Sequence, residues 1–138
     1  MQWATCHGLS NEDLFERVKD YYSIESSTID GQKGLFHILL NPDCEVYNGH
    51  FPGTPVSPGV CNIQMILECT ERIAQHSLRM RKLNRCRFTT LLSPQTHPEL
   101  DIQIDIQPKE EAIYTLNATI GKEENIYQML KAEVVFDE

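Results

Sequence analysis

The chain has 138 residues, of which 41% are hydrophobic and 23% are charged, a size and composition that fit one domain covering residues 1–138. Its formal net charge of −8 argues against nucleic acid as a partner, because binding to a phosphate backbone depends on basic residues. No apolar run approaches the roughly 18 residues of a membrane span, and the first residues lack the basic start and apolar stretch of a signal peptide, so we expect a cytoplasmic protein.

The first half of the chain contains the patterns of a helix, a β-hairpin and a long loop. Ser10 followed by Asp13 is typical of a helix start, where side-chain oxygens accept hydrogen bonds from free backbone amides. The loop carries three prolines, which lack the N–H group that a sheet ladder needs. In chain order we expect a helix at about 10–20, strands at 21–29 and 35–40 around a turn at 30–34, and the loop at 41–57.

The middle of the chain predicts one buried helix, from Val60 to Ala74. Pro58 and Gly59 precede it, and proline suits the first turn of a helix because its missing N–H is not needed there. Apolar side chains go nearly all the way round this helix, which indicates burial on most sides. One stripe, spaced by three and four residues, is consistently polar; it consists of Gln64, Glu68, Glu71 and Gln75.

The second half of the chain changes to the two-residue period of β-strands. The clearest alternation runs from Leu100 to Gln107, where Leu and Ile alternate with Asp and Gln. An antiparallel sheet that curls around the apolar helix would bury it, so we expect an α+β fold. The expected strands are 85–92, 100–107, 113–121 and 126–136.

Cysteine and histidine usage argues against disulfides and metal sites. The five cysteines are odd in number and contain no CxxC pair, which favours reduced thiols. Cys61 and Cys69 lie in the predicted helix, where a small apolar thiol is a more common role than a nucleophile. The five histidines show no HxH or HExxH spacing.

Five of the twelve basic residues gather in one short run, the basic cluster, which consists of Arg79, Arg81, Lys82, Arg85 and Arg87. On an acidic protein, such a local positive cluster favours docking of an anionic partner. The simpler interpretation is a solvated run of charges without a partner. Composition and spacing leave both interpretations open.

The most informative segment is GHFPGTPVSPGV, residues 49–60, which holds three prolines, three glycines and a histidine. It resembles, without a break, the active-site motif GHFPxxPxxPGV of the β-hydroxyacyl-acyl carrier protein dehydratases. The resemblance implies a hot dog fold, in which an antiparallel sheet wraps a long central helix. It also implies a dimer or larger oligomer with shared active sites, an acyl carrier protein as partner, and no metal or organic cofactor.

This family removes water from (3R)-3-hydroxyacyl thioesters to give trans-2-enoyl thioesters. By resemblance, His50 is expected to be the base that takes a proton from C2, a role that suits imidazole because it titrates near neutral pH. The free N–H groups of Gly59 and Val60, at the helix start, would bind the negative charge that develops on the thioester oxygen. Phe51 and Pro58 are expected to contact the substrate. The simpler alternative for His50 is a histidine that only caps the turn.

One position departs from the pattern of the family. The family carries Glu or Asp fourteen residues after the histidine, where this chain has Gln64, and many members carry Gln four residues later, where this chain has Glu68. An amide forms hydrogen bonds but supplies no proton as an acid does. Three hypotheses follow: Glu68 replaces the acid, the chain binds thioesters without turnover, or polar helix residues position a water in a thioesterase. A structural ion pair between Glu68 and Arg72 is a fourth interpretation.

The leading prediction is a dehydratase of acyl carrier protein thioesters, with His50, Gln64 and Glu68 as catalytic residues. Because acyl carrier protein is acidic, the basic cluster from Arg79 to Arg87 is predicted to be its docking surface. The alternatives are a catalytically impaired subunit that binds acyl thioesters or their carrier, and a hot dog acyl thioesterase.

Overall fold

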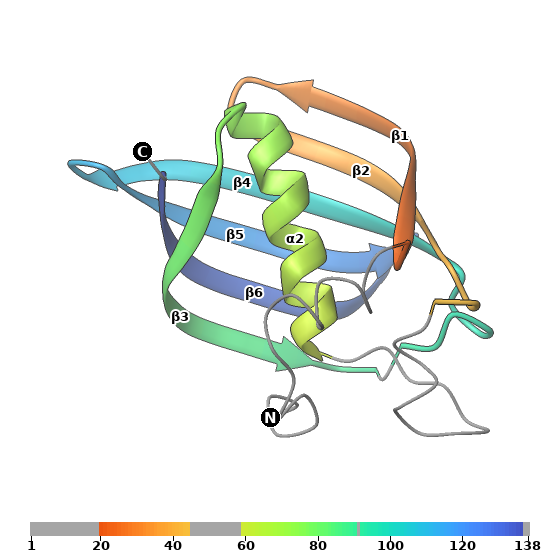
Figure 1. Ribbon diagram of the computed structural model, residues 1–138. Helices are drawn as coiled ribbons and strands as arrows, with labels where there is room; N and C mark the ends of the chain where they lie inside the picture. Colours follow the sequence, from red (N-terminus) through yellow and green to blue (C-terminus); the bar gives the residue numbers. More distant parts are fainter. Residues whose placement is uncertain (1–19, 45–58, 91, 137–138) are drawn as a thin grey trace.

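The computed structural model describes residues 20–44, 59–90 and 92–136 (Figure 1). The strands form one antiparallel sheet in the order β1-β2-β4-β5-β6-β3, which curves around the helix α2. This is the hot dog fold that the sequence predicted. The elements are β1 (Tyr22–Asp30), β2 (Lys33–Leu40), α2 (Gly59–Ala74), β3 (Leu78–Phe88), β4 (Glu99–Glu110), β5 (Ile113–Lys122) and β6 (Asn125–Phe136).

Three tight hairpins connect neighbours in the sheet, and each has a turn residue in the left-handed region. Gly31 (φ 63°) follows β1, Ala112 (φ 64°) follows β4, and Glu123 (φ 57°) follows β5. A Cβ atom disfavours this backbone conformation. At Ala112 and Glu123 the geometry of the tight hairpin therefore outweighs the residue's own backbone preference. Because these connections are short, the order of strands in the sheet follows the chain except at β3.

Strand β3 differs most from its prediction. It begins at Leu78 and ends at Phe88, whereas the predicted strand covered 85–92. Two irregularities in its pairing with β6 disturb the regular register, as β-bulges do. The inward side chains are therefore mostly three residues apart, and the two-residue period is lost from this part of the sequence. They are Leu78, Met80, Leu83 and Cys86.

Strand β4 also extends beyond its prediction, to Glu110, although it contains Pro108. The proline lies beside an irregularity in the pairing with β5, where a missing N–H group is tolerated. The remaining predicted strands and the helix match the structure to within two residues at each end. The helix expected at about 10–20, apart from Asp20, and the loop from residue 45 onward lie outside the described residues.

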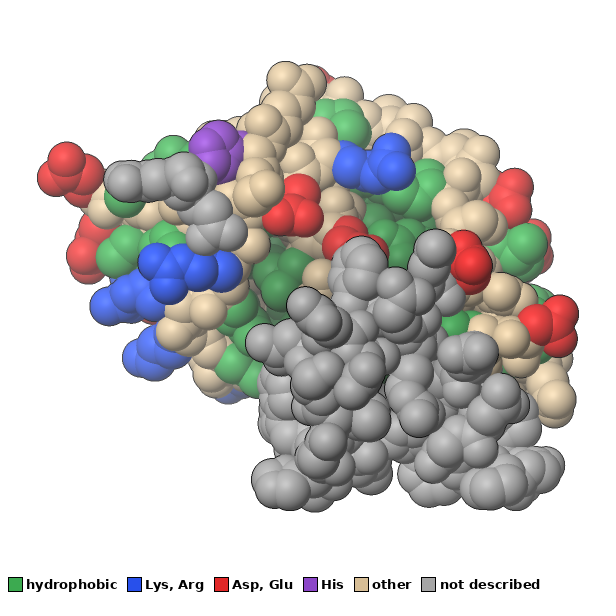
Figure 2. Space-filling view, viewed as in Figure 1, with side chains coloured by type: hydrophobic (Ala, Val, Ile, Leu, Met, Phe, Trp, Pro, Cys, Tyr) green, Lys and Arg blue, Asp and Glu red, His purple; other side chains and the backbone are tan. Residues whose placement is uncertain are grey.

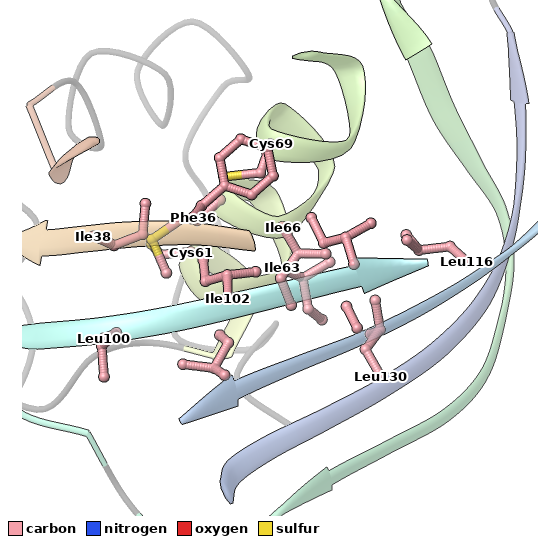
Figure 3. Close-up of a cluster of buried hydrophobic side chains, with 14 of the residues drawn as sticks. Phe36, Ile38, Cys61, Ile63, Ile66, Cys69, Leu100, Ile102, Leu116 and Leu130 are labelled. Carbon is pink, nitrogen blue, oxygen red and sulfur yellow. The ribbon is translucent and has the colours of Figure 1, made fainter. Parts of the chain in front are cut away.

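The hydrophobic core lies between α2 and the concave face of the sheet. Figure 3 shows Ile63 and Ile66 of the helix among side chains from the strands, which include Phe36, Ile102 and Leu116. All five are at most 3% exposed. Burying an aliphatic or aromatic side chain contributes about 1.5–3 kcal/mol, so this contact holds helix and sheet together. Within the described segments, no helix is long and apolar enough to cross a membrane.

A chain of polar groups crosses the same core and was not predicted. The Tyr21 hydroxyl donates to Asn62 Oδ1 at 2.7 Å, and Asn62 Nδ2 donates to Gln128 Oε1 at 3.3 Å. Gln128 Nε2 then lies 3.6 Å from Cys86 Sγ. Asn62 and Gln128 are each 1% exposed. Since buried polar groups are stable only when they are paired, these contacts fix α2 relative to the sheet.

Asn62→Ala is expected to lower the free energy of unfolding by about 1–3 kcal/mol, because it removes the donor to the Gln128 amide and the acceptor of the Tyr21 hydroxyl. Urea unfolding followed by circular dichroism measures the change. Asn117→Ala, at an exposed position of β5, is the matched control and should change the same free energy by less than about 0.5 kcal/mol. Equal losses in both variants would contradict a structural role for the polar chain.

Candidate functional site

The polar stripe forms a partly accessible face of α2, because its four members are exposed or half-buried. Gln64 is exposed and Glu68 is half-buried, while Cys61, Met65 and Cys69 around them are buried. In Figure 2, acidic side chains lie in the middle of this face, beside recessed hydrophobic surface. The helix therefore presents polar groups at the edge of an apolar environment, as a site for an acyl chain with a polar head requires.

The carboxylate of Glu68 has a polar neighbour at each oxygen. The Tyr22 hydroxyl, from β1, donates to Oε1 at 2.6 Å, and the Gln64 amide nitrogen donates to Oε2 at 3.4 Å, which is long for a hydrogen bond. Helical side chains lean toward the N-terminus of the helix, so the carboxylate of Glu68 lies over the turn that carries Gln64. The backbones of the two residues are about 6 Å apart along the helix axis, but the Glu68 carboxylate and the Gln64 amide lie side by side.

Tyr22 is a neutral donor in this contact. Burial, followed by the hydrogen bond to Glu68, raises the pKa of its phenol well above the ordinary value of 10.0, so the hydroxyl keeps its proton. The separation of 2.6 Å lies at the short end of the range for O–H···O hydrogen bonds. Among the described residues, Glu68 forms no ion pair with Arg72, so the structural role considered for that pair is not observed.

The other members of the stripe serve the fold. Glu71 Oε2 accepts a hydrogen bond from the Leu78 backbone N–H at 2.8 Å, which fixes the first residue of β3. Gln75 has φ 56° and ends the helix, with its N–H donating to the Glu71 carbonyl at 2.8 Å. Only Gln64 and Glu68 therefore remain as functional candidates within the stripe.

Three predicted site residues, His50, Phe51 and Pro58, lie outside the described residues. The helix α2 begins at Gly59, so the backbone N–H groups of Gly59 and Val60 belong to its first turn. N–H groups in that turn have no carbonyl partner within the helix and need one from elsewhere. This is the backbone arrangement that the oxyanion prediction assumed.

Comparison with known proteins supplies the family. Residues 26–129 match the ApeI-like family, whose description is ApeI dehydratase. The chain belongs to the ApeI-like dehydratase family. It is also similar to the 3-hydroxyacyl-[acyl-carrier-protein] dehydratase FabZ of Haemophilus influenzae, with 25% identity over 118 residues that cover 80% of this chain and 75% of the relative.

Solved structures share the fold of this chain. The dehydratase heterocomplex ApeI:P from Xenorhabdus doucetiae aligns with a TM-score of 0.65 at 16% identity, covering 82% of this chain and 96% of the other. A mutant of the thioesterase SAV0944 from Staphylococcus aureus aligns with a TM-score of 0.61 at 13% identity, covering 91% and 98%. At these identities the likeness supports the hot dog fold alone.

The basic cluster lies on β3, an edge strand, and Figure 2 shows Lys and Arg side chains gathered over it. Arg81 is engaged within the protein, because its Nη1 lies 2.6 Å from Glu133 Oε1, while Lys109 Nζ lies 2.6 Å from Glu133 Oε2. Arg79 is exposed. Three further exposed members form no ion pair within the described chain; these are Lys82, Arg85 and Arg87.

The outer face of the sheet, opposite α2, carries a groove of about 640 Å³. Its lining includes Leu35, Gln103 and Asn117, exposed side chains that alternate with buried ones along their strands. Of the predicted site residues within the described chain, only Arg85 contributes to this lining. The groove is therefore distinct from the face of α2 that carries Gln64 and Glu68.

The thiols of α2 are poor nucleophiles, as the sequence predicted. Cys69 is 0% exposed, and burial raises the pKa of its thiol to about 12. Such a thiol stays protonated at neutral pH, whereas nucleophilic attack needs the thiolate. Cys61 is also buried. In the parts of the chain that the structure describes, no group of His, Cys, Asp and Glu is arranged to hold a metal ion.

Glu133→Gln is expected to lower stability most at neutral pH. The hydrogen bond and charge of Lys109, together with Arg81, lower the pKa of this carboxyl below its ordinary value of 4.5. A lowered folded-state pKa contributes stability above about pH 4.5 that is lost as the pH falls through the folded value. The difference in melting temperature between native and variant should therefore shrink as the pH is lowered below 4.5.

Glu124→Gln, at the exposed turn after β5, is the control for removing one negative charge. Its melting temperature should follow that of the native chain at each pH, because a single exposed charge contributes little to stability. A pH-independent loss in Glu133→Gln would contradict the ion-pair explanation.

Proposed function

We propose that this protein removes water from 3-hydroxyacyl thioesters carried by acyl carrier protein and releases trans-2-enoyl thioesters. Membership of a dehydratase family supports the reaction class. The observation that carries the proposal is the position of one carboxylate: Oε2 of Glu68 lies 3.4 Å from the amide of Gln64, the residue at the position of the family's acid. A carboxyl group is thus available where the family pattern needs one, although the sequence carries it one turn later.

In the proposed reaction, His50 takes a proton from C2 of the substrate. The electrons of that C–H bond form the C2=C3 double bond, and the C3–O bond breaks. Glu68, protonated at Oε2, gives its proton to the departing hydroxyl, which leaves as water. The N–H groups of Gly59 and Val60 bind the thioester oxygen while negative charge develops on it. Return of the proton from His50 to Glu68 restores the starting state.

We propose that two subunits complete the site, with His50 from one and Glu68 from the other, as the family resemblance implies. The accessibility of the stripe supports this arrangement, because Gln64 is exposed and Glu68 is only half-buried. The solved ApeI:P relative is a heterocomplex. The second subunit is therefore either another copy of this chain or a homologous partner.

Hydrolysis of the thioester is the second candidate. An amide and a carboxylate 3.4 Å apart form a pair that is able to orient a water molecule toward a thioester carbonyl. The two reactions differ in their products, because hydrolysis frees a thiol and dehydration creates a conjugated double bond. A single assay with both readouts separates them.

Turnover of 3-hydroxybutyryl thioesters should follow the carboxylate of Glu68. We expect Glu68→Gln and His50→Ala each to lower kcat roughly 10²- to 10⁴-fold, because each removes a proton-transfer group. Gln64→Glu should not raise kcat, since the acid is already present. Enoyl absorbance measures dehydration, and a thiol-reactive dye measures hydrolysis.

Glu71→Gln is the matched control on the same helix, since an amide oxygen still accepts from the Leu78 N–H. Its kcat should equal that of the native chain. If the native chain and Glu68→Gln were equally inactive while Gln64→Glu turned substrate over, the native chain would be catalytically impaired. That result would refute the role of Glu68. Thiol release without enoyl formation would favour the thioesterase.

Carrier binding should depend on the unpaired members of the basic cluster. The double charge reversal Lys82→Glu and Arg85→Glu is expected to weaken affinity for acyl carrier protein roughly tenfold at low salt, because it removes complementary charge. Native affinity should fall as ionic strength rises, since exposed charges are screened. Titration calorimetry at two salt concentrations measures both effects.

Lys122→Glu, at the half-buried end of β5, is the control, because it lies outside the groove that Arg85 lines and β6 separates β5 from β3 in the sheet. It should bind the carrier as the native chain does. An affinity that is insensitive to salt, or equal weakening by the control, would place the carrier elsewhere.

A further inference from the structure

The contact between Tyr22 and Glu68 joins two distant parts of the chain, 46 residues apart. Tyr22 lies at the first position of β1, an edge strand, while Glu68 lies in the middle of α2. Tyr22 falls within the strand predicted at 21–29, and no pattern in the sequence gave it a role. Among the described residues, its hydrogen bond of 2.6 Å is the shortest contact to the carboxylate.

The backbone around Tyr22 is held firmly. Tyr22 is paired with Leu40 across the β1–β2 ladder. Asn41 Nδ2 donates to the Asp20 carbonyl at 2.8 Å, and the Asn41 backbone N–H donates to the Tyr21 carbonyl at 3.0 Å. These contacts anchor the start of β1 to the end of β2. The phenol of Tyr22 is therefore presented to α2 from a fixed position.

The two oxygens of Glu68 are held unequally. Oε1 accepts a short hydrogen bond from a half-buried phenol on the sheet side. Among the described residues, Oε2 has only the long contact of 3.4 Å to the amide of the exposed Gln64. A hydroxyl or water can replace so weak a contact, whereas Oε1 is already occupied. One oxygen is thus fixed and the other is available for proton transfer.

We propose that Tyr22 is a positioning residue for the dehydration, which binds Oε1 of Glu68 and so leaves Oε2 as the oxygen that carries the transferred proton. This inference rests on the proposed function. The role is positional because Tyr22 acts through Glu68, and a carboxylate that is free to rotate would present its proton in the wrong direction for part of the time. Orientation of this kind contributes to rate rather than to substrate affinity.

Tyr22→Phe tests the role, because it removes the hydroxyl and keeps the ring. We expect kcat for a 3-hydroxybutyryl thioester to fall roughly 10- to 100-fold while KM changes less than about twofold. Tyr114→Phe is the matched control, since the half-buried Tyr114 ring stacks on Phe136 and its hydroxyl has no hydrogen bond within the described residues. It should leave kcat and KM unchanged.

A double-mutant cycle separates positioning from general damage. In the Glu68→Gln background, Tyr22→Phe should cause no further loss of kcat, because the group through which it acts is gone. Native kcat in Tyr22→Phe, or the same loss in both backgrounds, would overturn the role of Tyr22 while the proposed function stands. Absence of turnover in the native chain, alone and with a homologous subunit, would overturn the proposed function and the role of Tyr22 with it.

Discussion

The burial of α2 on nearly all sides is the constraint on which the rest of this structure depends. A helix inside a curved sheet places its apolar side chains against the strands, and every polar group that enters the core needs a partner there. Asn62 meets this requirement through Tyr21 and Gln128. On the polar stripe, where Gln64 is exposed and Glu68 is half-buried, a carboxylate remains within reach of a ligand. The position of the candidate site thus follows from how the helix is buried.

Two neighbouring tyrosines link stability to the candidate site. Tyr21 binds Asn62 in the core, and Tyr22 binds Glu68 at the stripe. Tyr21 directly precedes β1 and Tyr22 begins it, where Asn41 ties the backbone to the end of β2. The segment that fixes the orientation of α2 against the sheet therefore also fixes the carboxylate. A change that loosened this segment would disturb both the packing of α2 against the sheet and the position of the Glu68 carboxylate.

The charge of β3 follows from its place at the edge of the sheet. Lys and Arg side chains on an exposed edge discourage uncontrolled pairing with other strands, so part of the basic cluster has a use without any carrier. Arg81 is engaged by the buried carboxylate of Glu133, whose second oxygen binds Lys109. The cluster is therefore weaker as a docking surface than its five charges in the sequence indicate. An acidic partner would contact its unpaired members, which include Lys82 and Arg85.

The sequence by itself determined the helix, most of the strands and the family, because each of these depends on local periodicity or on a contiguous motif. It misplaced β3, where register irregularities erased the two-residue period. It also identified Gln64 and Glu68 as the residues that depart from the family pattern. Only the tertiary structure decided that their side chains meet, that Tyr22 binds one oxygen of Glu68, and that Arg81 is paired with Glu133. Contacts between residues 46 or 52 positions apart depend on how strands and helix pack, and no local pattern encodes them.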